Sequence, residues 1–294
     1  MPGPNEVKVS VCVVTYNQEK YIAECLQSLV DQEVDFPFEV IVSDDCSKDG
    51  TRSIVAGFAE RYPDVIKPFL HEKNMGPYEN YWFAHRQASG EYIAHMDGDD
   101  YALPGKLQSQ ADFLDGRPEC NIVWHPVIKI DARGNFVSPL REHSEAVYGK
   151  KFYREDVIRF GAIGVNSSKM YRSSIREVPM PDFKVIDYFI NVEQVGDGYA
   201  AFSSSKPLGV YRQGVGIASS GTLTRSLLIK SISYFLDKYP EAKEAVSCIS
   251  LTLLLGDLRR RRDTLSSSFN LFIRSFSLST VFGYLNYFRF VKKL

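Results

Sequence analysis

The chain has 294 residues, of which 44% are hydrophobic and 13% aromatic, so it can bury a sizeable core in one large domain or in a domain with an appendage. Its 35 basic and 36 acidic residues leave a net charge of −1, which excludes a global field that attracts nucleic acid. Five scattered cysteines with no CxxC pair argue against a disulfide framework and against a structural zinc site.

The segment MPGPNEVKVS lacks the basic region and the apolar stretch of a signal peptide. An odd number of cysteines also fits a reducing compartment better than an oxidising one. We therefore expect a cytoplasmic protein.

Apolar runs rich in Val and Ile alternate with helical patterns along the first hundred residues. The periods predict strands at 7–14, 38–44, 65–70 and 91–96, and helices at 18–32, 48–62 and 78–88. Strands that alternate with helices of this length predict an α/β fold, with a Rossmann-like, mostly parallel sheet flanked by helices. In such folds ligands bind beyond the carboxyl ends of the strands, where the strand order reverses.

Polar side chains follow every one of these strands at the point where it ends. The four loops read TYNQE, SDDCSKDGT, HEKNMG and DGDD. Because the carboxyl ends of parallel strands meet at one edge, we expect these loops to form a single site. Its candidate residues are Thr15, Tyr16, Asn17, Glu19, Asp44, Asp45, Asn74, Asp97, Asp99 and Asp100.

Clustered carboxylates repel one another, and a divalent cation makes such a cluster tolerable. Few thiols or imidazoles stand near these acids in the sequence, which favours Mg²⁺ or Mn²⁺ over zinc. Magnesium usually keeps one or two carboxylates and takes further ligands from substrate phosphates. The acidic loops therefore predict Mn²⁺ or Mg²⁺ together with a nucleoside diphosphate compound.

Each loop also has an ordinary structural explanation. Asp97 to Asp100 are compatible with a turn in which Asp caps a helix that has Pro104 in its first turn. In the second loop, capping by Ser47 or Asp49 and a turn at Gly50 would suffice. Independent turns, however, would not need to fall at successive strand ends.

Three stretches together resemble the nucleotide-binding half of the family 2 glycosyltransferases with the GT-A fold. They are VSVCVVTYNQEKYIAECLQSLVDQ, EVIVSDDCSKDGT and NMGPYENYWFAHRQASGEYIAHMDGDD. The resemblance implies a GT-A catalytic domain over 1–220, with a nucleotide-sugar half at 7–115 and an acceptor half at 116–220. A helical C-terminal region at 221–294 would follow as an appendage.

The resemblance also implies roles for particular residues. The loop of residues 15–19 would cradle the base and ribose, and Asp45 would contact the base. The DxD motif falls on Asp97, Gly98 and Asp99, with the metal held chiefly by Asp99, and Asp100 extends it to DxDD. The implied reaction is an inverting transfer of a sugar from a UDP or GDP sugar to an acceptor hydroxyl, with a cation stabilising the departing diphosphate.

In the acceptor half, residues 121–137 predict a hairpin with a turn at 131–135. Asp187 opens a predicted helix at 184–198 and matches the position of the family's catalytic base, although Ile186 replaces the common preceding Glu. Asp182 and Glu193 are its rivals. The structural alternative for Asp187 is that it complements the dipole of that helix.

A loop at 211–221 resembles one that closes over the donor diphosphate in relatives. Arg212 is then a candidate phosphate ligand, with a surface ion pair as the alternative. Many relatives have a His shortly after this point, where the chain has Gln213 and Gly214. None of the five histidines has metal-ligand spacing, and we expect His95 to be half-buried.

From about residue 222 the sequence predicts helices without carboxylate clusters. Only 14 uncharged residues separate Arg274 from Arg289, fewer than the roughly 20 needed to span a bilayer. Apolar residues at helical spacing beside the basic run 259–262 predict binding to an anionic membrane surface, and hence a lipid-linked glycan acceptor. The alternatives are a hairpin packed on the catalytic domain and a contact between copies of the chain.

Two other functions remain open. A nucleotidyltransferase also binds metal and nucleotide beyond a parallel sheet, but it usually needs a Gly-rich signature with Arg or Lys near the first strand, which TYNQEKY lacks. A nucleotide-sugar-binding protein without activity would not need both the DxDD motif and Asp187.

Overall fold

The computed structural model describes residues 6–137, 145–161, 163–215, 222–278, 280 and 284, and it divides the chain into two compact units. The first consists of Met1–Lys150, Gly164–Glu177 and Ala200–Gly216, and the second of Lys151–Ile163, Val178–Tyr199 and Ile217–Leu294. Two segments of the predicted acceptor half, 151–163 and 178–199, therefore group with the C-terminal helices.

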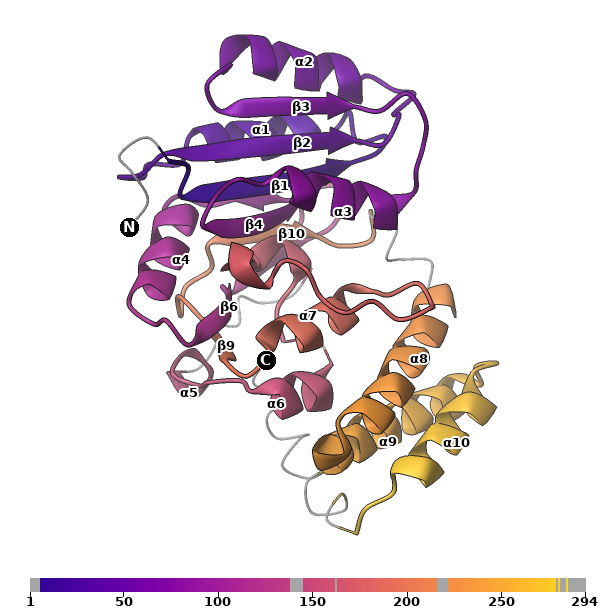
Figure 1. The fold of residues 1–294 in the computed structure, drawn as a ribbon. Helices are drawn as coiled ribbons and strands as arrows, with labels where there is room; N and C mark the ends of the chain where they lie inside the picture. Colours follow the sequence, from indigo (N-terminus) through magenta and orange to yellow (C-terminus); the bar gives the residue numbers. More distant parts are fainter. Residues whose placement is uncertain are drawn as a thin grey trace. The chain divides into compact units, whose positions relative to one another are not determined.

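A seven-stranded sheet in the order β3-β2-β1-β4-β8-β6-β9 is the centre of the first unit (Figure 1). Neighbours from β3 to β4 are parallel, and β8 runs antiparallel to both β4 and β6. The predicted α/β class with a mostly parallel sheet is thereby confirmed. The strands are β1 (Val9–Thr15), β2 (Phe38–Asp44), β3 (Ile66–Leu70), β4 (Tyr92–Asp97), β6 (Cys120–Trp124), β8 (Met170–Arg172) and β9 (Tyr199–Phe202).

Strand order reverses at β1, because β2 and β3 lie on one side of it and β4 lies on the other. The register pairs Thr15 with Asp44 and Val14 with Asp97, so the loops after β1, β2 and β4 leave the sheet at the same edge. The near-continuous burial of β1 and β2 is what parallel strands covered on both faces require. This edge is where an open α/β sheet binds its ligand.

The helices α1 (Ile22–Val30), α2 (Thr51–Arg61), α3 (Pro77–Gln87) and α4 (Lys106–Asp115) flank this sheet, with α1 and α3 on opposite faces (Figure 1). The helix α4 begins only after Gly105, which has a left-handed φ of 82°. Asp97 to Asp100 therefore do not cap it, and that structural explanation of the acids is wrong.

A second sheet of three strands, β5-β10-β7, consists of β5 (Tyr101–Ala102), β7 (Val127–Ile130) and β10 (Gly209–Arg212). The hairpin predicted for 121–137 is confirmed only in its second part, where Ile130 bridges Phe136 around the turn at 131–135. Its first part is wrong, because β6 belongs to the large sheet. Pro126 separates β6 from β7 and lacks the N–H that a continuous ladder would need.

Helices make up the second unit. They are α6 (Arg154–Phe160), α7 (Asp187–Val195), α8 (Thr222–Lys238), α9 (Lys243–Arg260) and α10 (Leu265–Ser275), while α5 (Glu145–Tyr148) belongs to the first unit. Short 3₁₀ turns lie at Asn166–Ser168 and Ser173–Ile175 in the first unit and at Pro240–Ala242 in the second. In the part of the chain that the structure describes, no helix is both long enough and apolar enough to cross a membrane.

Candidate nucleotide and metal site

Hydrogen bonds join the loop after β1 to the loop after β2. The N–H of Asn17 donates to the Ser47 hydroxyl (2.8 Å), and the Asn17 amide oxygen accepts from the N–H of Lys48 (2.8 Å). A carboxylate oxygen of Glu19 accepts from the N–H of Gly50 (2.7 Å). Asn17 has a φ of 53°, a left-handed conformation that Asn tolerates better than most residues. Asn17 and Glu19 thus fix the shape of this part of the site.

The turn at Gly98 packs tightly against the loop after β1. A Cβ at this position would lie 2.5 Å from the Gln18 amide oxygen and 3.0 Å from the Thr15 hydroxyl oxygen. The glycine is therefore needed for contact with the protein's own loop. Both of those oxygens are buried without a hydrogen-bond partner among the described residues. Tyr16, in the same loop, is 38% exposed to solvent.

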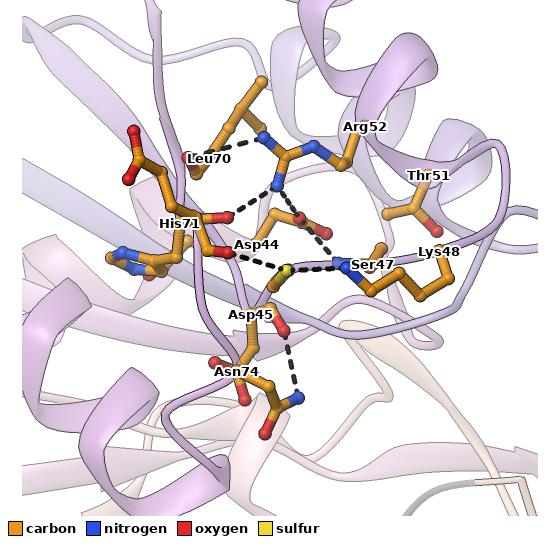
Figure 2. Close-up of polar contacts among 12 residues, drawn as sticks. Asp44, Asp45, Ser47, Lys48, Thr51, Arg52, Leu70, His71 and Asn74 are labelled. Carbon is orange, nitrogen blue, oxygen red and sulfur yellow. Dashed lines mark hydrogen bonds and ion pairs between the residues drawn. The ribbon is translucent and has the colours of Figure 1, made fainter.

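Asp44, at the end of β2, is completely buried. One carboxylate oxygen accepts from the N–H of Ser47 (3.0 Å) and from the Arg52 guanidinium (3.2 Å). Figure 2 shows Arg52 extending further to the carbonyls of His71 (2.7 Å) and Leu70 (3.5 Å). The Asp44–Arg52 ion pair therefore ties the end of β2 to the end of β3.

Asp45 holds the loop after β3. Its two carboxylate oxygens accept from the N–H groups of Met75 (2.6 Å) and Gly76 (2.9 Å), and its carbonyl accepts from the Asn74 side chain (3.0 Å; Figure 2). Asp45 is 3% exposed, whereas Asn74 is exposed. Three of the four predicted loops thus meet through side-chain hydrogen bonds at one edge of the sheet.

The acids of the DxDD motif differ in their surroundings. The Asp97 side chain is 37% exposed, and one of its oxygens lies 3.1 Å from His95 Nε2. Burial opposes its ionisation, but hydrogen bonds from His95 and Ser167 outweigh burial and hold the pKa of Asp97 below its usual range. Asp99 is 5% exposed, and burial together with the charge of Asp97 raises the pKa of Asp99 to about 6.

Asp100 is the most enclosed of the three. Its oxygens accept from the Ser167 hydroxyl (2.5 Å) and from the N–H of Arg212 (2.7 Å). Burial, followed by the charge of Asp97, raises the pKa of Asp100 to about 8. Asp100 therefore joins the motif to β10 and to the turn at 166–168.

Arg212 is buried, with only 7% exposure. Its guanidinium donates to the Asp99 carbonyl (3.0 Å) and to Glu24 (2.7 Å), and it lies 4.5 Å from the centre of the Tyr21 ring. The alternative of a surface ion pair is wrong for Arg212, although its partner Glu24 is half-exposed. Residues 216–221 of the predicted closing loop lie outside the described residues.

A buried lysine that the sequence did not single out lies behind these acids. Lys106 is completely buried and donates to the Ser167 carbonyl (2.7 Å). Burial lowers the pKa of Lys106 to about 8, against the opposing effects of Cys25 and Asp100. Its positive charge partly offsets the carboxylates from the core side.

The donor set fits a hard cation that shares its coordination with a ligand. The described residues contain no cluster of three or more His, Cys, Asp or Glu side chains that would hold a metal unaided. The charge of Asp97 nevertheless opposes the ionisation of Asp99, and a cation between them would remove that cost. Mg²⁺ or Mn²⁺ suits such a site, because either ion binds to one or two carboxylates and takes further ligands from phosphate oxygens.

The candidate bases lie in the second unit. Asp187 is the first residue of α7 and is exposed, and its carboxylate accepts from the N–H of Tyr188 (2.8 Å). Asp182 is also exposed. The Glu193 side chain, in contrast, is 4% exposed and accepts from Lys238 (2.8 Å) and from the Tyr239 hydroxyl (3.1 Å), so its carboxylate is already engaged by two donors.

Sequence comparisons cover mainly the first unit. The family model described as glycosyl transferase family 2 matches residues 10–175. An uncharacterized protein of Mycobacterium tuberculosis is 42% identical over 120 residues, which are 40% of this chain and 35% of that protein. The poly(ribitol-phosphate) beta-N-acetylglucosaminyltransferase TarS of Staphylococcus aureus is 42% identical over 112 residues, 37% of this chain and 19% of TarS. The matches thus span about a third or less of these relatives.

Comparisons of structure extend over most of the chain. A crystal structure of Staphylococcus aureus TarS with UDP-GlcNAc has a TM-score of 0.68 at 23% identity and covers 92% of this chain and 81% of that one. The mannosyltransferase PcManGT from Pyrobaculum calidifontis, in complex with GDP-Man and Mn²⁺, has a TM-score of 0.62 at 18% identity, over 97% of this chain and 81% of that one. These likenesses confirm the predicted GT-A type of fold.

Proposed function

Because the chain belongs to glycosyl transferase family 2, we propose that it transfers a sugar from a nucleotide sugar to an acceptor hydroxyl. The observation that carries this proposal is the meeting of Asp44, Asp45 and the DxDD acids at the edge where strand order reverses. The donor is a UDP or GDP sugar, since solved structures of similar fold hold UDP-GlcNAc or GDP-Man. The cation is Mn²⁺ or Mg²⁺, and PcManGT was solved with Mn²⁺.

In the proposed reaction, Tyr16 faces the base from the solvent side of the loop after β1, and Asp45 and Asn74 hold the loop that borders it. Asp97 and Asp99 would hold the cation, which stabilises the charge of the departing diphosphate. The acceptor oxygen bonds to the anomeric carbon as the bond from that carbon to the phosphate oxygen breaks. The acceptor proton passes to Asp187, and the nucleoside diphosphate leaves with the electron pair.

A thermal-shift screen of nucleotide sugars with and without Mn²⁺ tests this function, because a ligand that binds only the folded state raises the apparent stability. We expect a shift with a UDP or GDP sugar that depends on the cation, and release of UDP or GDP on incubation. Release of pyrophosphate from a nucleoside triphosphate would instead identify a nucleotidyltransferase. Binding without any turnover would identify a nucleotide-sugar-binding protein.

The helices α9 and α10 carry an apolar and basic surface that suits the cytoplasmic face of a membrane. Phe269, Ile273 and Phe276 recur at helical spacing and are 45% to 57% exposed. Arg259 to Arg261, at the end of α9, are exposed as well. Apolar area beside basic groups attracts an interfacial helix to anionic lipid, at about 1 kcal/mol per basic group. Arg274 contributes less, because it pairs with Asp237 (2.9 Å).

The predicted apolar residues Val281, Phe282 and Leu285, and the cations Arg289, Lys292 and Lys293, lie outside the described residues. Membrane binding places the acceptor among lipid-linked glycans, as in assembly of a surface polysaccharide. The alternative, an apolar contact between copies of the chain, would use the same exposed side chains and give a homo-oligomer.

Replacing Phe269 and Ile273 together by Ser should reduce co-sedimentation with vesicles that contain anionic lipid at least fivefold, because it removes exposed apolar area without touching the core of the unit. The control is Phe136→Ser, which removes a 70% exposed ring from the first unit. Equal pelleting of the wild type and the double variant would contradict the proposal. A wild-type dimer that the double variant separates would favour the contact between copies.

A further inference from the structure

A continuous chain of hydrogen bonds runs from the DxD motif into the core of the first unit. His95 Nε2 lies 3.1 Å from a carboxylate oxygen of Asp97, and His95 Nδ1 lies 3.0 Å from His85 Nε2. His85 Nδ1 in turn lies 2.7 Å from the Tyr171 hydroxyl. The two histidines and the tyrosine are completely buried. They come from α3, β4 and β8, so only the folded unit brings them together.

The direction of these hydrogen bonds follows from counting donors. An ionised Asp97 only accepts, so His95 Nε2 must carry a proton, and in a ring with a single proton Nδ1 then accepts. His85 then carries its own proton on Nε2 and accepts at Nδ1 from the Tyr171 hydroxyl. Burial, together with the nearby charges of Lys169 and Arg176, holds the pKa of His85 well below its usual range, which agrees with a neutral ring.

Packing holds both rings in this arrangement. The Tyr81 ring stacks on His85 at 3.9 Å between centroids and 22° between planes, and it lies 5.0 Å from His95. An imidazole flipped over in its own plane would put C–H groups where the ring nitrogens now lie and leave buried partners without a hydrogen bond, which is costly. The Nε2–H of His95 is therefore a fixed donor.

We propose that Tyr171, His85 and His95 are positioning residues, which orient the Asp97 carboxylate toward the cation and diphosphate of the bound donor. His95 donates to one oxygen of Asp97 from the core side, while the Asp97 side chain as a whole remains 37% exposed. Ser167 donates to the other oxygen of Asp97 at 3.2 Å, but it shares its hydroxyl with Asp100 at 2.5 Å, so it does not occupy the position of the His95 donor. This role rests on the proposed function, whereas the hydrogen-bond chain itself does not.

The hydrogen-bond chain is tested without any ligand. Nitrogen-15 NMR of the full-length protein labelled at histidine distinguishes a protonated ring nitrogen from one with a lone pair. We expect His85 and His95 both to carry the proton on Nε2 only, and Tyr171→Phe to shift the Nδ1 resonance of His85. A proton on Nδ1 of either ring, or an imidazolium at His95, overturns the proposal.

The effect on Asp97 is tested by calorimetry of UDP and GDP in the presence of Mn²⁺. His95→Phe keeps the aromatic packing but removes the donor, and it should weaken binding at least tenfold, within the 10- to 100-fold range typical of a lost support for a metal ligand. His95→Gln restores an N–H donor and should recover most of that loss. Binding of wild-type strength in a folded His95→Phe protein overturns the proposal.

A matched pair of variants distinguishes the role of the hydrogen-bond chain from the general effect of removing a buried hydroxyl. Tyr171→Phe should weaken the same binding about threefold, because it releases the far end of the hydrogen-bond chain. Tyr92→Phe, also in the buried sheet, removes a hydroxyl that donates to Asp115 (2.6 Å) and should leave binding unchanged. Equal effects of the two variants count against the proposal. If the wild type binds neither nucleotide, the proposed function fails, while the NMR result still decides the hydrogen-bond chain.

Discussion

Asp99→Ala should nearly abolish the Mn²⁺-dependent binding of UDP or GDP, with a loss of at least a hundredfold measured by calorimetry. The reason is that Asp99 is proposed to be the chief protein ligand of a cation that otherwise relies on the diphosphate. The control is Asp112→Ala, which removes an exposed carboxylate on α4 that bonds only to Gln108 in the described part of the chain. Undiminished affinity in Asp99→Ala would remove Asp99 from the site.

The fold should tolerate this change. A pKa of about 6 means that folded Asp99 holds its proton more tightly than in an unfolded chain, where the pKa is about 3.9. Its contribution to stability is therefore complete below about pH 4 and is lost as the pH rises through 6. At pH 7 without metal, Asp99→Ala should melt at or above the wild-type temperature. Protons also compete with the cation, so nucleotide binding by the wild type should weaken as the pH falls below about 6.

The sequence predicts the strands and helices of the first hundred residues well, because the buried residues there recur at the spacing of a strand or of a helix. The strand predicted at 38–44 is β2 itself, and the first helix buries Ile22, Cys25, Leu26 and Leu29 on one face. Loops that leave one edge of a parallel sheet must then converge. Short strands escape this reasoning: β5 has two residues, which are too few to show any period.

The supporting residues of the site were predicted poorly. We expected His95 to be half-buried, and it is completely buried. Its partner His85 stands ten residues earlier, on a helix, and neither spacing nor type marks the two as neighbours. The same holds for Lys106, whose role depends on how α4 packs beneath the turn at 166–168. Such contacts are set by tertiary packing, which the periodicity of one sequence does not contain.

Asp187→Asn should lower kcat at least a hundredfold while leaving donor affinity nearly unchanged. An acceptor hydroxyl is a weak nucleophile, and a carboxylate that takes its proton as the new bond forms typically contributes about 10² to 10⁴ in rate, or roughly 2.7 to 5.4 kcal/mol. Asp97 and Asp99 would be engaged with the cation, and Glu193 is held by Lys238 and Tyr239. Asp187 is exposed at the start of α7, and its change to Asn keeps the shape of the side chain but removes its basicity.

The matched control is Asp182→Asn, which makes the same change at an exposed carboxylate five residues earlier. Steady-state kinetics with the native acceptor separate kcat from KM, and a base that acts only in the transition state should leave the KM for the donor within about twofold. The helix-dipole alternative predicts a different pattern, a small loss of stability of about 0.3 to 1 kcal/mol and little change in kcat. If Asp187→Asn retains wild-type turnover while Asp182→Asn loses it, the base is Asp182, and it lies in the segment that precedes α7.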